Sequence, residues 1–155
     1  KRFTVLRVDD FLWEAKKELE ELHKEYLIEI LFDLHLTHDL LTINGDELLL
    51  KVLIMNLMDN GCKYSDNNRV QVTLTTLPGD IISIEFLNSG DGIQPLDLER
   101  IFDPFYRGKV NRKISGFGVG LSLADKIAKL HEGKILVESI PGQVTRFTVI
   151  LPVHI

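Results

Sequence analysis

The stretch NLMDNGCKYS, at residues 56–65, decides how the rest of the chain is interpreted. Asn56 and Asn60 are four positions apart and Lys63 follows three positions later, so on a helix all three lie along one face. The opposite face is apolar and contains Leu50, Leu53, Ile54, Leu57 and Met58. An amide inside an apolar helix is costly unless it finds partners. Capping or bridging would explain one asparagine, whereas a stacked pair followed by a lysine favours a ligand, and an amide oxygen suits Mg²⁺ when the other ligands are phosphates.

The hydrophobic periodicity on either side predicts alternating segments of helix and strand. Three helices are predicted: one capped by Asp9 or Asp10 and running to about residue 23, one at about 47–64, and one at about 119–132 that ends at Gly133. Strands are predicted at residues 3–7, 27–35, 69–75, 81–87, 134–139 and 146–151. Helices and strands are partly segregated, so the predicted class is α+β, a mixed or antiparallel sheet with helices on one face.

Two glycine-containing segments lie at the ends of predicted elements: one follows a strand and the other begins a helix. In LNSGDGI, residues 87–93, Gly90 and Gly92 allow close backbone approach, and Asn88 offers both a donor and an acceptor. An ordinary turn at the end of a strand explains this segment equally well. In GFGVGLSLADKI, residues 116–127, alternate glycines open a helix, an arrangement that can bind an anion through free backbone N–H groups. A flexible hinge is compatible with that role.

Residues 88–115 lack regular periodicity, and a long irregular segment inside a small domain is usually functional. This segment has a basic cluster formed by Arg107, Lys109, Arg112 and Lys113. Such a cluster is usually solvated, but beside a phosphate site it becomes a candidate clamp for a triphosphate. Its aromatic residues, Phe102, Phe105 and Tyr106, are expected to anchor the segment by packing.

Composition limits the possible functions of the 155-residue chain, which is long enough for one domain. A formal charge of −5 argues against a general nucleic-acid binder, because neutralising phosphates needs an excess of Lys and Arg. The single cysteine, Cys62, excludes an internal disulfide and suits a reducing, cytosolic setting. No stretch is long and apolar enough to span a membrane. Because the chain opens at Lys1 rather than Met, we expect it to be a piece of a longer or processed protein.

The four segments in this order resemble the catalytic, ATP-binding domain of sensor histidine kinases in the GHKL superfamily, which also includes gyrase-type and MutL-type ATPases. Residues 56–65 are similar to the asparagine box, 87–93 to the first glycine box, IFDPFYRG to the phenylalanine box, and 116–127 to the second glycine box. The resemblance extends from about Phe3 to Pro152. It implies a Bergerat-type fold, a two-layer sandwich of a mixed, mostly antiparallel sheet with about three helices on one face, in one domain spanning residues 1–155.

The resemblance also implies roles for individual residues in binding ATP and Mg²⁺. Asn60 would hold the metal with support from Asn56, Lys63 would pair with phosphate, and Tyr64 would lie near the ribose or adenine. Asn88 occupies the position of the adenine-reading residue, usually Asp. The remaining expected contacts are Gly90, Gly92 and Ile93 in the base pocket, Gly116, Gly118 and Gly120 around the phosphates, Leu121 beneath them, and Arg107 on the γ-phosphate. Residues from about 94 to 115 would form a lid over the nucleotide.

The resemblance implies an ATP-dependent protein histidine kinase, which transfers the γ-phosphoryl group of ATP to a histidine on a separate phosphoacceptor domain. We expect this phosphoacceptor domain, which also dimerises the family's proteins, to be absent from the 155 residues, since none of their histidines has the family's acceptor motif. Related hydrolases place Glu four residues before the metal-binding Asn, as general base. Here Asn56 occupies that position and cannot take a proton, so transfer is favoured over hydrolysis. Asn56, Lys63 and Arg107 are therefore the predicted catalytic residues.

Two alternatives share the same predicted fold. One is a degenerate module that binds ATP and signals without transferring phosphate, and the other is a protein-serine kinase of the anti-sigma type. The expected partners are the phosphoacceptor domain of the same protein and a response regulator, without nucleic acid or direct membrane contact. We expect the fragment to be monomeric and cytoplasmic, in a protein that could be anchored in the bacterial inner membrane.

Overall fold

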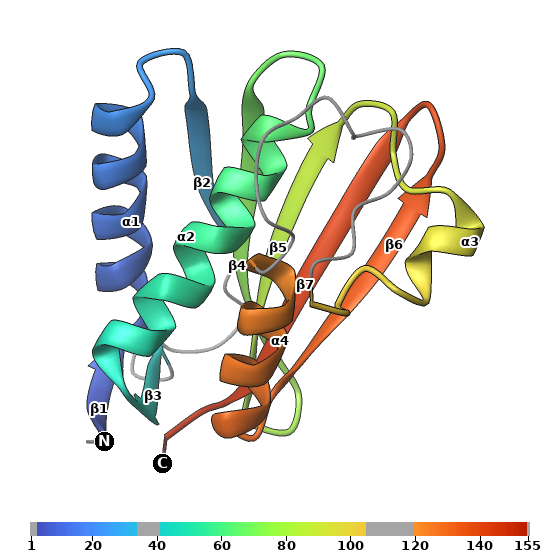
Figure 1. The fold of residues 1–155 in the computed structure, drawn as a ribbon. Coiled ribbons are helices and arrows are strands. Elements are labelled where there is room, and N and C mark those ends of the chain that lie inside the picture. Colours follow the sequence, from blue (N-terminus) through green and yellow to red (C-terminus); the bar gives the residue numbers. More distant parts are fainter. Residues whose placement is uncertain (1–2, 34–40, 105–119, 155) are drawn as a thin grey trace.

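The computed structural model describes residues 3–33, 41–104 and 120–154. Helices α1 (Val8–Leu22), α2 (Glu47–Lys63) and α4 (Gly120–Leu130) lie side by side over one face of a five-stranded sheet (Figure 1). The strands of that sheet are β2 (Leu27–Asp33), β4 (Arg69–Leu77), β5 (Ile81–Ser89), β6 (Lys134–Ile140) and β7 (Val144–Pro152). A short helix, α3 (Pro95–Leu98), lies apart from these three helices, beside β6. This is the α+β sandwich that the sequence predicts.

The five strands follow the order β2-β4-β5-β7-β6, and only the pairing of β2 with β4 is parallel. Alternate residues of the central strands face the helices and are buried, because successive side chains of a strand point to opposite faces. The core-facing residues of β4, for example, are Val70, Val72 and Leu74, as their alternation with polar residues predicts. The core lies between this sheet face and the three long helices.

Helix α2 is the central helix and begins where the sequence indicates. The Asp46 side chain accepts a hydrogen bond from the Leu49 N–H group at 3.0 Å, which satisfies one of the free donors of the first turn. The expected apolar face is buried, including Leu50, Leu53 and Leu57. Near the C-terminal end of the helix, Gly61 is needed for close packing, because an added Cβ would lie 2.5 Å from Cγ2 of Val70 on β4. Helix α2 therefore sits directly on the sheet.

Two predicted helix boundaries are wrong in detail. Helix α1 begins at Val8 with Arg7 as its N-terminal flanking residue, and neither Asp9 nor Asp10 caps it. The Arg7 guanidinium instead binds both carboxylate oxygens of Asp9, at 3.0 and 3.1 Å. At the end of α4, Glu132 rather than Gly133 adopts the left-handed conformation, with φ of 61°. Gly133 has a packing role, since an added Cβ would lie 2.1 Å from the Ile150 carbonyl oxygen on β7.

Two elements are absent from the sequence prediction. Strand β3 (Thr42–Gly45) pairs antiparallel with β1 (Thr4–Arg7) in a separate two-stranded sheet. Both strands are four residues long, too short for a clear alternation of apolar and polar residues. Helix α3 has no buried residues and spans a single turn inside the segment predicted to be irregular. No helix among the described residues is long and apolar enough to cross a lipid bilayer.

Candidate functional site

The C-terminal half of α2 brings Asn56, Asn60 and Lys63 onto one helix, as predicted. Asn56 Nδ2 donates to the carbonyl oxygen of Gly120, the first residue of α4, across 3.2 Å. A carbonyl oxygen only accepts, so this contact orients the amide with its nitrogen toward Gly120 and its oxygen away from that bond. The side chains of Asn56 and Asn60 are partly buried, and Tyr64 follows α2 as its C-terminal flanking residue. The asparagine face of α2 therefore meets the beginning of α4.

Lys63 has a carboxylate partner that is not among the predicted site residues, Asp59. Its Nζ atom lies 3.5 Å from Oδ2 of Asp59, one helical turn earlier. The other Asp59 oxygen, Oδ1, accepts a hydrogen bond from the Tyr26 hydroxyl at 2.6 Å. Spacing of four residues on a predicted helix could have indicated the Asp59–Lys63 pair. Tyr26 lies 33 positions away in sequence and could not have been found in that way.

A row of polar side chains crosses three strands beside this helix. Asn88 on β5 lies opposite Thr145 on β7, and Thr145 lies opposite Ser139 on β6. Asn88 and Thr145 are each only 6% exposed. The Ser139 and Thr145 hydroxyl oxygens are 3.0 Å apart. Among the described residues, the Asn88 amide has one long contact, from Nδ2 to the Ser89 carbonyl oxygen at 3.5 Å. The buried amide thus lies in register with Thr145 on the neighbouring strand, and the described part of the chain uses little of its hydrogen-bonding capacity.

The sequence pattern predicts Asn88 as a site residue but does not predict Thr145 or Ser139. The signal for Thr145 was present, because it is in phase with the buried apolar residues Phe147, Val149 and Leu151 of the same strand. A polar residue in an apolar phase has to find hydrogen-bonding partners. The predicted strand at residues 146–151 starts one residue after Thr145, so the predicted alternation does not include it, whereas β7 begins at Val144.

The glycines of the first glycine segment keep the backbone close to neighbouring chains. A Cβ on Gly90 would lie 2.6 Å from the Tyr64 carbonyl oxygen, at the end of α2. Gly92 has φ of 76°, and its Cβ would lie 2.9 Å from Ser139 Oγ. The next residue, Ile93, donates its backbone N–H to the same Ser139 oxygen at 2.7 Å. The loop after β5 is therefore fastened both to the end of α2 and to β6.

The second glycine segment is described only from Gly120 onward. Gly120 begins α4, and Leu121 is partly buried against the hydrophobic core. Arg107, Gly116 and Gly118 lie outside the described residues, as does the part of the predicted lid from residue 105 onward. Within the described part of the lid, Ile101 is buried and Phe102 contacts Phe147 edge-on, with ring centroids 6.4 Å apart. Phe102 thus packs as its aromatic character predicts.

The parts of α2 and of the sheet that hold these residues lie toward one end of the molecule, and the beginning of α4 lies nearer its middle (Figure 1). In Figure 1 the C-terminal ends of β5 and β6 lie toward the same end of the sheet as the C-terminal end of α2, and the beginning of α4 faces the middle of α2. The arrangement combines two amides and one lysine on α2 with a buried amide and two hydroxyls on the sheet. Lysine and amide donors suit an anionic group, and the buried row suits a planar ligand with its own donors and acceptors.

Comparison with known proteins connects this geometry to a family. Residues 45–155 match the family described as histidine kinase-, DNA gyrase B- and HSP90-like ATPase. The adaptive-response sensory kinase SasA of Rippkaea orientalis is 34% identical over 137 residues, which cover 88% of this chain and 34% of that protein. The sensor histidine kinase RcsC of Escherichia coli is 35% identical over 72% of this chain and 12% of its own length. The chain therefore spans about a third or less of these two relatives.

A solved structure agrees with the sequence relatives. The catalytic domain of the histidine kinase ThkA superposes with a TM-score of 0.77 and 26% identity, covering 98% of this chain and 97% of that chain. The mycobacterial sensor histidine kinase MprB, at 20% identity, shows the same fold with a TM-score of 0.81. The chain thus belongs to the family of histidine kinase-, DNA gyrase B- and HSP90-like ATPases, and within it to the catalytic domains of sensor histidine kinases.

Proposed function

We propose that this domain binds Mg-ATP between α2, the beginning of α4 and the polar row on the sheet, and transfers the γ-phosphoryl group to a histidine of a separate phosphoacceptor domain. The buried Asn88 amide would meet the adenine, with Thr145 beside it and Gly92 and Ile93 along the edge of the pocket. Lys63 would pair with phosphate, and Tyr64 would lie near the sugar or base. The fit is supported by a buried amide whose hydrogen-bonding capacity is little used by the described residues, and by glycines whose absent side chains leave room.

The residues on α2 are also suited to a phosphate-bound magnesium ion. Asn60 would hold the metal through its amide oxygen, which adds no negative charge where phosphates already supply several. Bound there, Mg²⁺ would neutralise charge on the phosphate oxygens. Lys63 adds a positive charge three residues further along the helix, so this chain contributes mainly positioning and charge compensation.

Transfer rather than hydrolysis is supported by one observation above all, the hydrogen bond from Asn56 Nδ2 to the Gly120 carbonyl oxygen. A residue at this position that donates to a carbonyl cannot at the same time remove a proton from water, and an amide has no basic site at neutral pH. A carboxylate in the same place would face the carbonyl with another acceptor. The site therefore binds the triphosphate without activating water, which leaves the γ-phosphoryl group for an external nucleophile.

Further contacts and the partner domains are inferred from the family to which the chain belongs. Arg107 would reach the γ-phosphate from the lid, and Gly116 and Gly118, in the second glycine segment, would contact the phosphates. The acceptor histidine would lie on a helical dimerisation domain of the same protein, and a response regulator would receive the phosphoryl group. A cytoplasmic location follows from the need for ATP and for that regulator.

Calorimetric titration with ATP, with and without Mg²⁺, tests the binding step. We expect the isolated chain to bind Mg-ATP, and Asn60→Ala to remove most of the Mg²⁺-dependent affinity. Asn67→Ala is the matched control, because Asn67 is exposed and lies beyond α2. If Mg²⁺ raises the ATP affinity equally in the wild type and in Asn60→Ala, Asn60 does not bind the metal.

Radiolabelled ATP tests the transfer step. The chain alone should neither hydrolyse ATP appreciably nor label itself, whereas a histidine phosphoacceptor domain joined to it should become labelled in an acid-labile form. Substantial steady-state hydrolysis by the chain alone would contradict the proposal. Acid-stable labelling of serine would instead support a serine kinase.

A further inference from the structure

Lys63, the lysine proposed to pair with phosphate, contacts an anionic side chain of its own helix. Its ammonium nitrogen lies 3.5 Å from Oδ2 of Asp59, and the two side chains are about equally exposed, at 30% and 31%. Because Asp59 precedes Lys63 by four residues on α2, the pair spans one helical turn. A carboxylate and a phosphate oxygen offer the same kind of anionic partner to an ammonium group. Asp59 is thus placed to compete with a phosphate oxygen for the Lys63 ammonium group.

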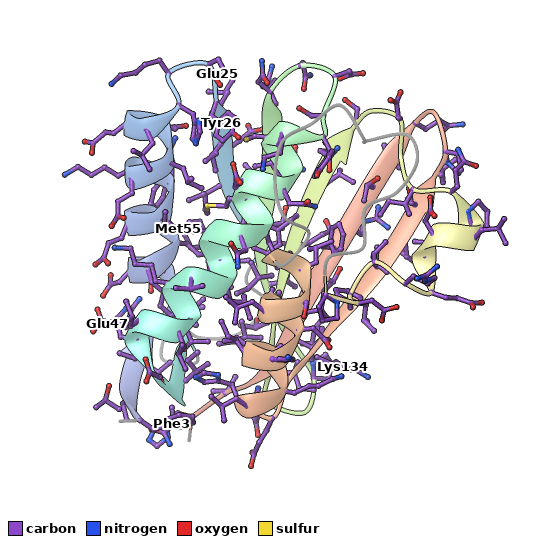
Figure 2. The ribbon with its side chains drawn as sticks, viewed as in Figure 1. Phe3, Glu25, Tyr26, Glu47, Met55 and Lys134 are labelled. Carbon is purple, nitrogen blue, oxygen red and sulfur yellow. The ribbon has the colours of Figure 1, made fainter. Side chains whose placement is uncertain are left out.

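The Asp59 carboxylate is held in place from outside α2. Its Oδ1 atom accepts the Tyr26 hydroxyl at 2.6 Å, and Tyr26 is only 8% exposed, with its ring stacked on His23 at a centroid distance of 4.4 Å. Figure 2 shows Tyr26 where β2 begins, near the C-terminal end of α2. Burial and the hydrogen bond to Asp59 raise the pKa of Tyr26, so the phenol keeps its proton and remains a donor. With one oxygen fixed in this way, the other is kept facing Lys63.

We propose that Asp59 is a built-in counter-ion that competes with the nucleotide phosphates for Lys63, so that nucleotide binding exchanges the Asp59 carboxylate for a phosphate oxygen. This inference rests on the proposed function, because it assumes that the phosphates meet Lys63. Asp59 acts through Lys63 and is a positioning residue, and its effect is to weaken the affinity for ATP and ADP.

The strength of the Asp59–Lys63 pair suits such an exchange. Partly exposed ion pairs four residues apart on a helix are weak and break readily. The pair has to be broken before a phosphate oxygen can take the place of Asp59 beside Lys63. This exchange acts against nucleotide binding, so removing the charge of Asp59 should strengthen binding. A residue that merely supported the fold would have the opposite effect when replaced.

Asp59→Asn tests the sign of this effect. The asparagine has the same shape and retains an oxygen that accepts from Tyr26, but it has no charge. Calorimetry with Mg-ATP and with ADP should show tighter binding than in the wild type, by about threefold to fivefold. The matched control is Asp125→Asn, which removes the same charge from another four-residue pair, Asp125 Oδ2 to Lys129 Nζ at 3.0 Å on α4. Its affinity should stay within about twofold of the wild type.

A double-mutant cycle with Lys63→Met then tests whether Asp59 acts through Lys63. In the Lys63→Met background, Asp59→Asn should leave the affinity unchanged. The inference is overturned if Asp59→Asn binds nucleotide as weakly as the wild type or more weakly, or if its gain persists without Lys63. Circular dichroism and thermal unfolding of each variant establish that it is folded. Failure of the wild-type chain to bind Mg-ATP would overturn the proposed function and this inference with it, whereas normal wild-type binding with no gain in Asp59→Asn would overturn the inference alone.

Discussion

The Asn56 side-chain amide and the Gly120 backbone carbonyl form a 3.2 Å hydrogen bond that joins the middle of α2 to the beginning of α4. Residues 45–155 match an ATPase family, and α2 contains the asparagine segment of this chain whereas α4 begins within its second glycine segment. The bond therefore connects two parts of the proposed nucleotide site that are 64 positions apart in sequence. It needs a donor on residue 56, which a carboxylate lacks.

Asn56→Asp should destabilise the domain through this contact. The aspartate would place an acceptor against the Gly120 carbonyl oxygen, so the bond is lost and two acceptors face each other in a partly buried place. We expect the free energy of unfolding to fall by about 1–3 kcal/mol. Urea denaturation at pH 7 measures it, with Asn67→Asp as the exposed control, expected to change stability by less than about 0.5 kcal/mol. Equal losses in both variants would show that the bond contributes nothing.

Asn88→Asp should sharpen the preference for ATP over GTP. A carboxylate accepts from the N6 amino group of adenine and repels the O6 of guanine, whereas an amide can turn to satisfy either base. We expect the ratio of affinities to rise about tenfold, chiefly because GTP binds more weakly. Asn88→Ala should weaken both nucleotides.

Competitive displacement of a fluorescent nucleotide by ATP and GTP measures these ratios. Asn44→Asp makes the same substitution at an exposed position on β3 and should leave the ratio unaltered. An identical ratio for the wild type and the Asn88→Asp variant would mean that this side chain does not contact the base edge.

Cys62 should make the domain less stable in alkaline solution. The thiol is fully buried, and burial together with the charge of Asp59 raises its pKa from 9.0 to about 12. Between these values the unfolded chain releases the thiol proton and the folded chain retains it, so rising pH favours unfolding. Through this group, the free energy of unfolding should fall by up to about 1.4 kcal/mol per pH unit.

Urea denaturation of the wild type and Cys62→Ala at pH 8 and pH 10 isolates this contribution. At pH 8 the alanine variant is expected to be less stable than the wild type, because its buried side chain is smaller. Between pH 8 and pH 10, however, its free energy of unfolding should fall by about 1 kcal/mol less than that of the wild type. Tyr26 has a raised pKa and is present in both proteins, so its contribution cancels in the comparison. Parallel losses in the two proteins would contradict the role assigned to Cys62.

Gly133→Ala should be far more damaging than Gly142→Ala. A Cβ on Gly133 would lie 2.1 Å from the Ile150 carbonyl oxygen, so backbone must move apart between the end of α4 and β7. A Cβ on Gly142 would meet nothing within 4 Å, and its cost comes only from φ of 78°. We expect losses of about 3 kcal/mol or more for the first and about 1–2 kcal/mol for the second. Thermal unfolding of both variants compares the two losses directly. Similar losses would mean that the backbone near Gly133 can move away from the Ile150 carbonyl oxygen at little cost in stability.

Local spacing was enough to place one side of the candidate site. The helical period is fixed by backbone geometry, so positions 56, 60 and 63 had to share a face once the helix was recognised. The same reasoning correctly assigned Val70, Val72 and Leu74 to the buried face of β4 from their alternation with polar residues. Asp46 at the start of α2 follows from the same local rules, because a cap involves only residues within one turn.

By itself, then, the sequence determined the three long helices, the central strands and the asparagine face of α2, since each depends on contacts within a few residues. Only the tertiary structure decided which residues complete the site. The row formed by Asn88, Thr145 and Ser139 exists because β5, β7 and β6 pair in a particular register, and register is a property of strands distant in sequence. The Tyr26–Asp59 hydrogen bond likewise depends on packing between the start of β2 and α2, and no periodicity in either segment encodes which hydroxyl meets which carboxylate.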